Sequence, residues 1–279
     1  MEKITKVKDI QQYIIDQKHK GIQLGFVPTM GALHQGHLEL IKQAKEENDK
    51  VICSIFVNPL QFNRKEDLES YPIRIEKDIE MLENINCDVL FTPQSEELYA
   101  QKVEDSYSFG SIALEMEGAY RPGHFEGVAA VIERFFSIIT ADKAYFGEKD
   151  YQQLAIIKWV KKHFNFPIEI IGCKTVRDEN GLALSSRNYL LTKQQLQTAT
   201  QLYDCMHYCK AMKNKKTPHE LISTCLQKLG KDFKIEYIKI VDEDTLLPIN
   251  NWSDTTHPRV FIAAYLSHVR LIDNLSLID

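Results

Sequence analysis

The segment Pro28–His37 (PTMGALHQGH) carries two glycines and two histidines between a short apolar run and a helical pattern. Gly31 and Gly36 let the backbone approach a ligand closely. The helix expected to begin near Gly36 offers backbone N–H groups and the positive end of its dipole, which suit a phosphate. His34 and His37 can project from one side of its first turn and stabilise charge on that phosphate. The segment predicts a phosphate site, although taken alone it also fits a loop with two ordinary surface histidines.

Two later segments combine side chains that suit a polyphosphate. Gly147–Asp150 (GEKD) follows an expected strand, and its lysine could bring an ammonium group to phosphates. Asp150 could cap the next helix or help to hold magnesium or a ribose. Leu184–Arg187 (LSSR) offers two hydroxyls and a guanidinium, which matches phosphate with two parallel hydrogen bonds. Each segment, taken alone, also fits a capped helix start or turn with solvated charges.

Two further loops carry groups that suit a small hydroxy acid or amino acid. Asn58–Phe62 (NPLQF) offers two amides, which can both donate and accept hydrogen bonds. In Tyr120–Gly127 (YRPGHFEG), Arg121 and His124 could receive a carboxylate. The alternatives are a polar turn and a structured surface loop. The sequence has no P-loop, dinucleotide fingerprint or nucleophile elbow, so a covalent serine or cysteine mechanism lacks support.

Composition narrows the class of protein. The 279 residues, 44% of them hydrophobic, are enough for one large α/β domain or a main domain plus a smaller one. The formal charge of −5, with scattered basic residues, predicts no nucleic-acid partner. No signal peptide is visible, and no apolar run approaches the roughly 20 residues of a membrane helix. We therefore expect a cytoplasmic protein with soluble substrates and no membrane partner.

The six cysteines include no C-x-x-C pair and are interpreted as reduced thiols. Cys205, His207 and Cys209 are close enough in sequence to consider a metal site. No second ligand pair with zinc-like spacing follows, which favours a single helix with small, half-buried residues.

Helix and strand patterns alternate in the first part of the chain, which predicts a parallel sheet with right-handed crossovers. Expected strands are Ile22–Val27, Val51–Val57, Asp88–Phe91, Lys143–Phe146 and Ile168–Ile171. One helix is expected to start at Val7. Further helices are expected over Leu38–Asn48, Ile75–Asn86, Gly127–Thr140 and Tyr151–His163. Ligands of parallel sheets bind at the carboxyl ends of the strands, where the candidate segments lie.

An α+β pattern follows after about Val176. Its expected helices are Gln194–Lys213 and Pro218–Leu229, and its expected strands are Phe233–Val241, Arg259–Tyr265 and His268–Asp273, with a tight turn at Leu266–Ser267. The fold class predicted is α/β, with a Rossmann-like parallel-sheet domain over 1–176 and a smaller α+β domain over 177–279.

The order of the segments PTMGALHQGH, FVNPLQF, YRPGHFEGV, YFGEKDYQQ and GLALSSRN resembles that of the pantothenate synthetases, the ligases that join pantoate to β-alanine. The resemblance runs from about Val27 to the C-terminus, with few signatures in the last hundred residues. The family shares an H-x-G-H motif with the class I aminoacyl-tRNA synthetases. It also shares a later mobile loop of the K-M-S-K-S kind, matched here by Ser185-Ser186-Arg187.

The resemblance implies site residues for each substrate. For ATP they are Met30, Gly31, Ala32, Leu33, His34, Gln35, Gly36, His37, Gly147, Glu148, Lys149, Asp150, Val176, Leu184, Ser185, Ser186 and Arg187. The catalytic subset is His34, His37, Lys149, Ser185, Ser186 and Arg187. For pantoate they are Pro28, Met30, Gln61, Val131, Ile132 and Gln153. For β-alanine they are Gln61, Arg121 and His124. Asp78 is implied as a water-mediated contact of Mg²⁺, and the family implies a homodimer.

The resemblance also implies the reaction. The carboxylate of (R)-pantoate attacks the α-phosphorus of ATP, giving pantoyl adenylate and pyrophosphate. The amine of β-alanine then displaces AMP and gives pantothenate. The domain over 1–176 would bind ATP and pantoate, and the domain over 177–279 would close over the nucleotide.

Two positions depart from the family pattern. Tyr71-Pro72-Ile73-Arg74 stands where Tyr-Pro-Arg-Thr is common, so the arginine is displaced by one position and its role is in doubt. Leu184 stands where methionine is common and keeps the apolar contact.

Two other functions are compatible with the first motif. A different adenylyl transferase would keep the nucleotide in its final product, but Asn58, Gln61 and Gln153 supply a compact polar pocket rather than a base-sized one. A non-catalytic nucleotide-binding protein would bind ATP without releasing pyrophosphate. A tRNA-charging role is disfavoured because no basic appended domain is present.

Overall fold

The computed structural model describes residues 1–62, 68–69, 71–100 and 106–278, in two compact units. The first unit comprises Met1–Phe109, Arg121–Glu148 and Gln153–Lys174. The second comprises Gly110–Tyr120, Lys149–Gln152 and Thr175–Asp279. The sequence predicted one boundary between residues 176 and 177. Two short segments from the earlier part of the chain also belong to the second unit.

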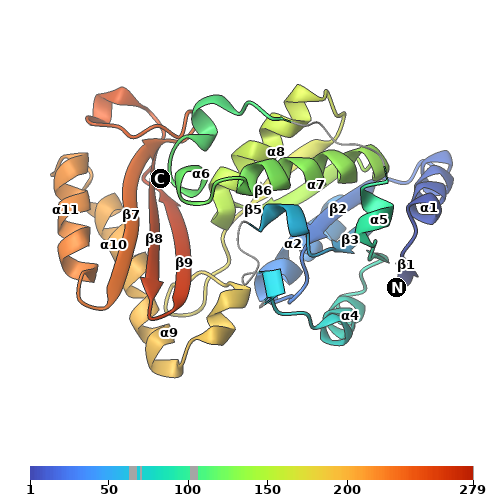
Figure 1. Cartoon of the computed structure of the whole chain (residues 1–279), viewed down its shortest axis with the longest axis horizontal. Coiled ribbons are helices and arrows are strands. Elements are labelled where there is room, and N and C mark those ends of the chain that lie inside the picture. The colour runs from blue at the N-terminus through green and yellow to red at the C-terminus, as the bar shows by residue number, and fades with distance from the viewer. Residues whose placement is uncertain (63–67, 70, 101–105, 279) are drawn as a thin grey trace. The chain divides into compact units, whose positions relative to one another are not determined.

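The first unit is built on a six-stranded sheet in the order β1-β4-β3-β2-β5-β6, with every pair parallel (Figure 1). Its strands are β1 (Glu2–Ile4), β2 (Leu24–Thr29), β3 (Lys50–Ile55), β4 (Val89–Phe91), β5 (Lys143–Gly147) and β6 (Glu169–Cys173). The inner strands are almost wholly buried, as expected for a sheet covered on both faces.

Helices cover both faces of this sheet. They are α1 (Val7–His19), α2 (Gln35–Glu47), α4 (Ile75–Asn84), α5 (Ser95–Leu98), α7 (His124–Ile138) and α8 (Tyr151–His163), with short 3₁₀ turns η1 (Pro59–Gln61) and η3 (Glu148–Asp150). On one face Ile41 of α2 and Leu82 of α4 join Val27 of β2 in one apolar cluster. On the other face Phe135 of α7 makes an edge-to-face contact with Phe26, with ring centroids 5.5 Å apart.

The second unit contains an antiparallel sheet in the order β7-β8-β9, formed by β7 (Phe233–Asp242), β8 (Pro258–Leu266) and β9 (Val269–Ser276). Its helices are α6 (Glu117–Tyr120), α9 (Lys193–Ala199), α10 (Gln201–Met212) and α11 (Pro218–Leu229), with 3₁₀ turns η2 (Gly110–Ala113), η4 (Ser186–Leu190) and η5 (Trp252–Asp254). Residues of α10 and α11, among them Met206 and Leu221, share one core with Ile262 of β8.

Side chains outside this core connect residues 110–120 and 149–152 to the sheet of β7, β8 and β9. Arg270 of β9 makes two hydrogen bonds to the carboxylate of Glu117, at 2.8 and 2.7 Å. The Tyr151 ring contacts that of Phe261, with centroids 6.0 Å apart. Polar and aromatic contacts, rather than sequence order, therefore assign residues 110–120 and 149–152 to the second unit.

The predicted fold class is confirmed, and three details of the element assignment are wrong. The charged strand β1 was not predicted. The helix predicted over Gln194–Lys213 is two helices, α9 and α10, which are separated at Thr200. The Thr200 hydroxyl donates to the carbonyl of Gln197 at 2.8 Å, a side-chain bond that competes with the regular helical pattern. The tight turn lies at Ser267-His268, one residue later than predicted, and Ser267 has a left-handed φ of 55°.

All six cysteines are free and buried. Cys205 and Cys209 lie on the buried side of α10, whereas His207 is exposed and its ring lies 4.3 Å from that of Tyr203. Among the residues that the structure describes, no three His, Cys, Asp or Glu side chains are placed to hold a metal ion. The segment lies within α10, the single helix that this interpretation expected.

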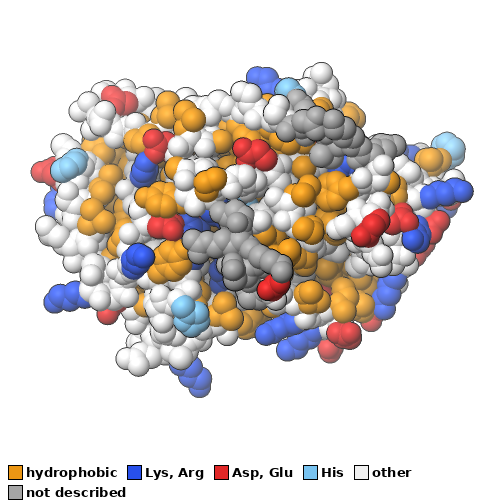
Figure 2. All heavy atoms as spheres, viewed as in Figure 1, with side chains coloured by type: hydrophobic (Ala, Val, Ile, Leu, Met, Phe, Trp, Pro, Cys, Tyr) orange, Lys and Arg blue, Asp and Glu red, His pale blue; other side chains and the backbone are white. Residues whose placement is uncertain are grey.

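On the face drawn in Figure 2, Lys and Arg side chains are interspersed with Asp and Glu. No helix in the described part of the chain is long and apolar enough to cross a membrane.

Candidate active site

The loop after β2 is held in an uncommon backbone conformation. Gly31 and Ala32 have positive φ angles of 80° and 49° in succession. The Thr29 hydroxyl donates to the carbonyl of Ser54 at 2.8 Å and accepts from the amide of Gly31 at 3.2 Å. A left-handed alanine is unusual, so the surroundings must fix this turn.

Asp78 of α4 supplies the main support for that turn. One carboxylate oxygen accepts from the Ala32 amide at 2.9 Å, and the other accepts from the Leu33 amide at 2.8 Å. Asp78 is buried, and burial raises the pKa of its carboxyl above the usual value, against the two amide bonds and the charge of Arg74. The sequence implied a water-mediated magnesium contact for Asp78. Its position shows a structural role, which is to shape the candidate phosphate loop.

The displaced arginine stands next to this support. Arg74 is the N-cap residue of α4, and its carbonyl accepts from the amide of Asp78 at 2.9 Å. The positive charge of Arg74 favours the ionised form of Asp78. Ile73, at the position where the family commonly has arginine, is 77% exposed.

The two histidines cap the helix that follows. Nδ1 of His34 accepts from the amide of Gly36 at 3.1 Å, and Nδ1 of His37 accepts from the amide of His34 at 3.3 Å. Since each Nδ1 is an acceptor, the neutral imidazole must carry its proton on Nε2. The rings lie close together, with centroids 4.1 Å apart, and both are half-buried. The pair can thus present two N–H donors beside the start of α2.

Gln61 anchors a second group of predicted residues. Its Nε2 lies 2.9 Å from Sδ of Met30, and its Oε1 accepts from Nδ2 of Asn58 at 3.2 Å. Asn58 also donates to the carbonyl of Gly127 at 2.9 Å and accepts from the hydroxyl of Tyr99 at 2.8 Å. The structure thus brings Gln61 and Met30, both predicted for pantoate, into contact.

The three residues predicted for β-alanine, Gln61, Arg121 and His124, lie in contact with one another. Nη1 of Arg121 lies 3.0 Å from Nε2 of His124, and Nδ1 of His124 lies 2.9 Å from the carbonyl oxygen of Gln61. A guanidinium can only donate, so Nε2 of His124 accepts and Nδ1 donates to Gln61. Arg121, His124 and Gln61 therefore form one hydrogen-bonded chain.

The remaining predicted residues of the first unit are separate from these contacts. Val131 and Ile132 are buried in α7, Pro28 lies in β2, and Gln153 is half-buried in α8. Gly147 ends β5, and Glu148 begins η3. Gln35 is exposed and bonds to Glu39 at 2.5 Å.

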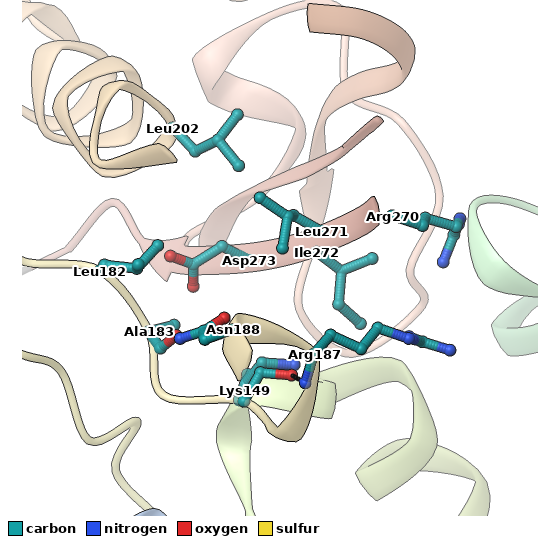
Figure 3. Close-up of a pocket in the computed structure, with 11 residues that line it drawn as sticks. Lys149, Leu182, Ala183, Arg187, Asn188, Leu202, Arg270, Leu271, Ile272 and Asp273 are labelled. Carbon is teal, nitrogen blue, oxygen red and sulfur yellow. Dashed lines mark hydrogen bonds between the residues drawn. The ribbon is translucent and has the colours of Figure 1, made fainter. Parts of the chain in front are cut away.

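The second unit contains the other predicted ATP residues. Lys149, Ser185 and Arg187 line one pocket, together with Asp273 and Arg270 of β9 (Figure 3). The Ser185 hydroxyl accepts from the amide of Arg187 at 3.2 Å and caps η4. Val176 and Leu184 are joined by a backbone hydrogen bond of 2.9 Å at the base of this loop. Ser186 follows in η4, and the Asp150 carboxylate lies 3.7 Å from the Lys149 ammonium.

Several residues that shape the site were not predicted. Tyr99 orients Asn58, and Arg177, Asp273 and Asn274 support the pocket of the second unit. Arg177 and Asp273 are separated by 96 residues, so no local spacing could reveal their pairing. The one available signal was the arginine itself, close before the Ser185 segment.

The parallel sheet makes this an α/β protein, and the histidine-capped helix start at the carboxyl end of one strand is a place suited to a phosphate-bearing ligand. The family model described as "Pantoate-beta-alanine ligase" matches residues 2–276. The chain therefore belongs to the pantoate–β-alanine ligase family, as the sequence motifs predicted.

Individual relatives agree with this assignment. The chain is 44% identical over 285 residues to the pantothenate synthetase of Cytophaga hutchinsonii, with both chains fully covered. It is 42% identical over 280 residues to that of Clostridium botulinum strain 657, covering 99% of each chain.

Solved structures give the same result. The crystal structure of pantothenate synthetase from Thermus thermophilus superposes with a TM-score of 0.91, at 37% identity and full coverage of both chains. The ligase from Francisella tularensis, complexed with beta-gamma ATP and beta-alanine, gives a TM-score of 0.79 at 37% identity, covering 99% of this chain and 98% of that one.

Proposed function

We propose that this protein condenses (R)-pantoate with β-alanine in an ATP-dependent reaction that gives pantothenate, AMP and pyrophosphate through pantoyl adenylate. The observation that carries the proposal is the family match over residues 2–276, which contains every motif of the candidate site. The histidine-capped start of α2 and the Gln61 cluster support it chemically.

The chemistry explains why ATP is required. A carboxylate does not react with an amine at neutral pH, because oxide would have to leave. Attack of the pantoate carboxylate on the α-phosphorus forms pantoyl adenylate and releases pyrophosphate. The amine of β-alanine then attacks the acyl carbon, and AMP leaves as a stable phosphate monoester. The protein must align the reactants and stabilise negative charge rather than form a covalent bond.

The ATP-binding role follows from donors and positive charge. The Nε2–H groups of His34 and His37 suit phosphate oxygens, as do the ammonium of Lys149 and the guanidinium of Arg187. Ser185 and Ser186 add hydroxyl donors. We assign these residues to transition-state stabilisation, and the rest of residues 30–37 and 147–150, with Val176 and Leu184, to nucleotide binding. The order of these motifs in the family supports their action on one nucleotide.

Mg²⁺ fits this assignment as an ion carried mainly by the phosphates of ATP. Both carboxylate oxygens of Asp78 already accept from loop amides, so an ion there would be reached through water, as Mg²⁺ commonly is. When bound, the ion would neutralise phosphate charge.

The acid-binding role rests on the Gln61 cluster. Its amide can bind the hydroxyl or carboxylate of pantoate, while Met30 and Pro28 offer apolar surface for the gem-dimethyl group. Val131, Ile132 and Gln153 complete the predicted pantoate set. Arg121 and His124, bonded in series to Gln61, suit the approach of β-alanine. The family resemblance further supports a homodimer and a location in the cytoplasm. Light scattering after gel filtration would test the dimer.

An omission assay tests the function directly. The protein is mixed with ATP, Mg²⁺, pantoate and β-alanine, each left out in turn, and nucleotides and acids are separated by chromatography. AMP and pantothenate in equal amounts, only when all are present, are expected. A product that retains AMP would instead identify another adenylyl transferase. ATP binding with no pyrophosphate from any mixture would identify a non-catalytic protein.

A further inference from the structure

Two adjacent residues of β9, Asp273 and Asn274, contact the two chain segments that supply Lys149 and Ser185 to the pocket of the second unit. Asn274 donates from Nδ2 to the carbonyl oxygen of Lys149 at 2.8 Å. Asp273 accepts from the two terminal nitrogens of Arg177 at 2.6 and 2.9 Å. Asp273 and Asn274 are 5% and 3% exposed. The Asp273–Arg177 contact is charge-assisted, and both contacts come from buried side chains that hold their partners in one geometry.

Arg177 carries the first connection to the loop. Its guanidinium also donates to the carbonyls of Gly181, at 3.0 Å, and Asn274, at 3.3 Å. It lies 4.4 Å from the centre of the Tyr203 ring. Arg177 pairs with Ala183 in an antiparallel bridge, directly before the Ser185 segment. Asp273 therefore fixes the base from which Ser185 and Arg187 extend.

Asn274 carries the second connection, and its amide can face only one way. Its Oδ1 accepts from Nη1 of Arg259 at 2.6 Å, and a guanidinium cannot accept in return. Nδ2 must then be the group that faces Lys149. Arg259 is itself held, with its guanidinium 3.9 Å from the ring centre of Tyr151 and Nε 3.0 Å from Glu243. Lys149 thus receives its hydrogen bond from a rigid donor.

Lys149, Ser185 and Arg187 line one pocket whose wall includes Asp273, as Figure 3 shows for the labelled residues. Asp273 and Asn274 thus support both Lys149 and the segment that carries Ser185 and Arg187. We propose that Asp273 and Asn274 are positioning residues for adenylation: Asn274 sets Lys149, and Asp273 sets the Ser185–Arg187 segment through Arg177. This inference rests on the proposed function.

Asn274→Asp is the sharpest single test. The change is isosteric and keeps an oxygen for Arg259, but it turns the donor that faces the Lys149 carbonyl into an acceptor. The rate of pantoyl-adenylate formation in a single turnover should fall about 10- to 100-fold, the scale of a misplaced reacting group. The kcat/KM for β-alanine should stay unchanged, because it reports only the steps after the adenylate has formed. Asn251→Asp is the matched control, since Asn251 is an exposed residue of the same unit that caps η5.

A double-mutant cycle separates positioning from general damage. In a Lys149→Ala background the ammonium is gone, so Asn274→Asp should lower the adenylation rate less than about twofold further. Losses that multiply in the double variant would overturn the proposal, because they would show that Asn274 does not act through Lys149. If Asn274→Asp does not fold, as judged by circular dichroism, Asp273→Asn replaces it in a cycle with Arg187→Ala, with the same expectation.

The outcomes distinguish the two proposals. If the wild-type protein makes no AMP from ATP, pantoate and β-alanine, the proposed function is wrong. An active wild type, with Asn274→Asp as fast as Asn251→Asp, would overturn the positioning role alone.

Discussion

His34 and His37 cap the same helix through their Nδ1 atoms, which accept backbone amides at 3.1 and 3.3 Å. The contact does two things at once. It satisfies amides that a helix start leaves without intrahelical partners, and it fixes the proton of each neutral ring on Nε2. The histidines of this motif are therefore structural caps as well as candidate phosphate donors, and the two roles can be separated by mutation.

Asparagine can cap a helix as histidine does here, because its Oδ1 lies near the place of Nδ1. We expect His34→Asn to keep the stability of the wild type while adenylation falls roughly 10²–10³-fold, the scale of one lost transition-state donor. His34→Ala should lose the same activity and also about 1 kcal/mol of unfolding free energy. Urea unfolding and a pyrophosphate-release assay measure the two effects. Equal stability of both variants would refute the capping role.

The hydrogen-bond donors assigned to the phosphates of ATP make a separate prediction. Lys149→Ala, Arg187→Ala and His37→Ala should each lower the adenylation rate roughly 10²–10³-fold without unfolding the chain. Lys158→Ala is the control, because Lys158 is an exposed residue of α8. Stopped-flow measurement of pyrophosphate release gives the rates. Near-normal turnover in all three variants would mean that the assigned roles are wrong.

Gly127 allows α7 to approach η1 closely. A Cβ built on Gly127 would lie 2.2 Å from the carbonyl oxygen of Leu60 and 2.5 Å from Cα of Gln61. Gly127→Ala must therefore push η1 away and displace Gln61, at a cost of about 1–3 kcal/mol or more. The KM for pantoate should rise roughly tenfold, the effect of a misplaced binding group. Ser137→Ala, on an exposed position of α7, should change neither quantity.

Asp78 predicts a pH dependence of stability. Its raised pKa means that ionisation costs more in the folded state than in the unfolded chain, mainly because the carboxyl is buried. Its contribution to stability is therefore full below the unfolded pKa of about 4 and falls as pH rises through the folded pKa. Asp78→Asn cannot titrate. The unfolding free energy of the wild type minus that of the variant should decrease over this pH window and then level off.

Denaturant unfolding at a series of pH values measures this difference. Parallel curves for the two proteins would show that Asp78 has no raised pKa. The variant should also turn over about tenfold more slowly. Ala32 and Leu33 donate to different oxygens of Asp78, and the amide nitrogen that replaces one of them in asparagine cannot accept, so the loop is misplaced.

The sequence by itself determined the elements and motifs that depend on near neighbours. The spacing of His34 and His37, the glycines between them and the apolar runs of β2 and β3 all follow from local periodicity, because a strand or a helix turn repeats over few residues. Gln61, Arg121 and His124 were predicted from motif order, and the structure places them in one chain of hydrogen bonds.

The tertiary structure alone decided which distant groups support the site. Glu117 and Arg270 are 153 residues apart, and their pairing assigns a short early segment to the second unit. Asp78 reaches the loop of Ala32, and Asn274 reaches Lys149, across 46 and 125 residues. No local periodicity of the sequence predicts such pairs, because they form only when separate elements fold against each other. For this reason the sequence revealed the groups suited to ATP, and only the fold revealed what holds them in place.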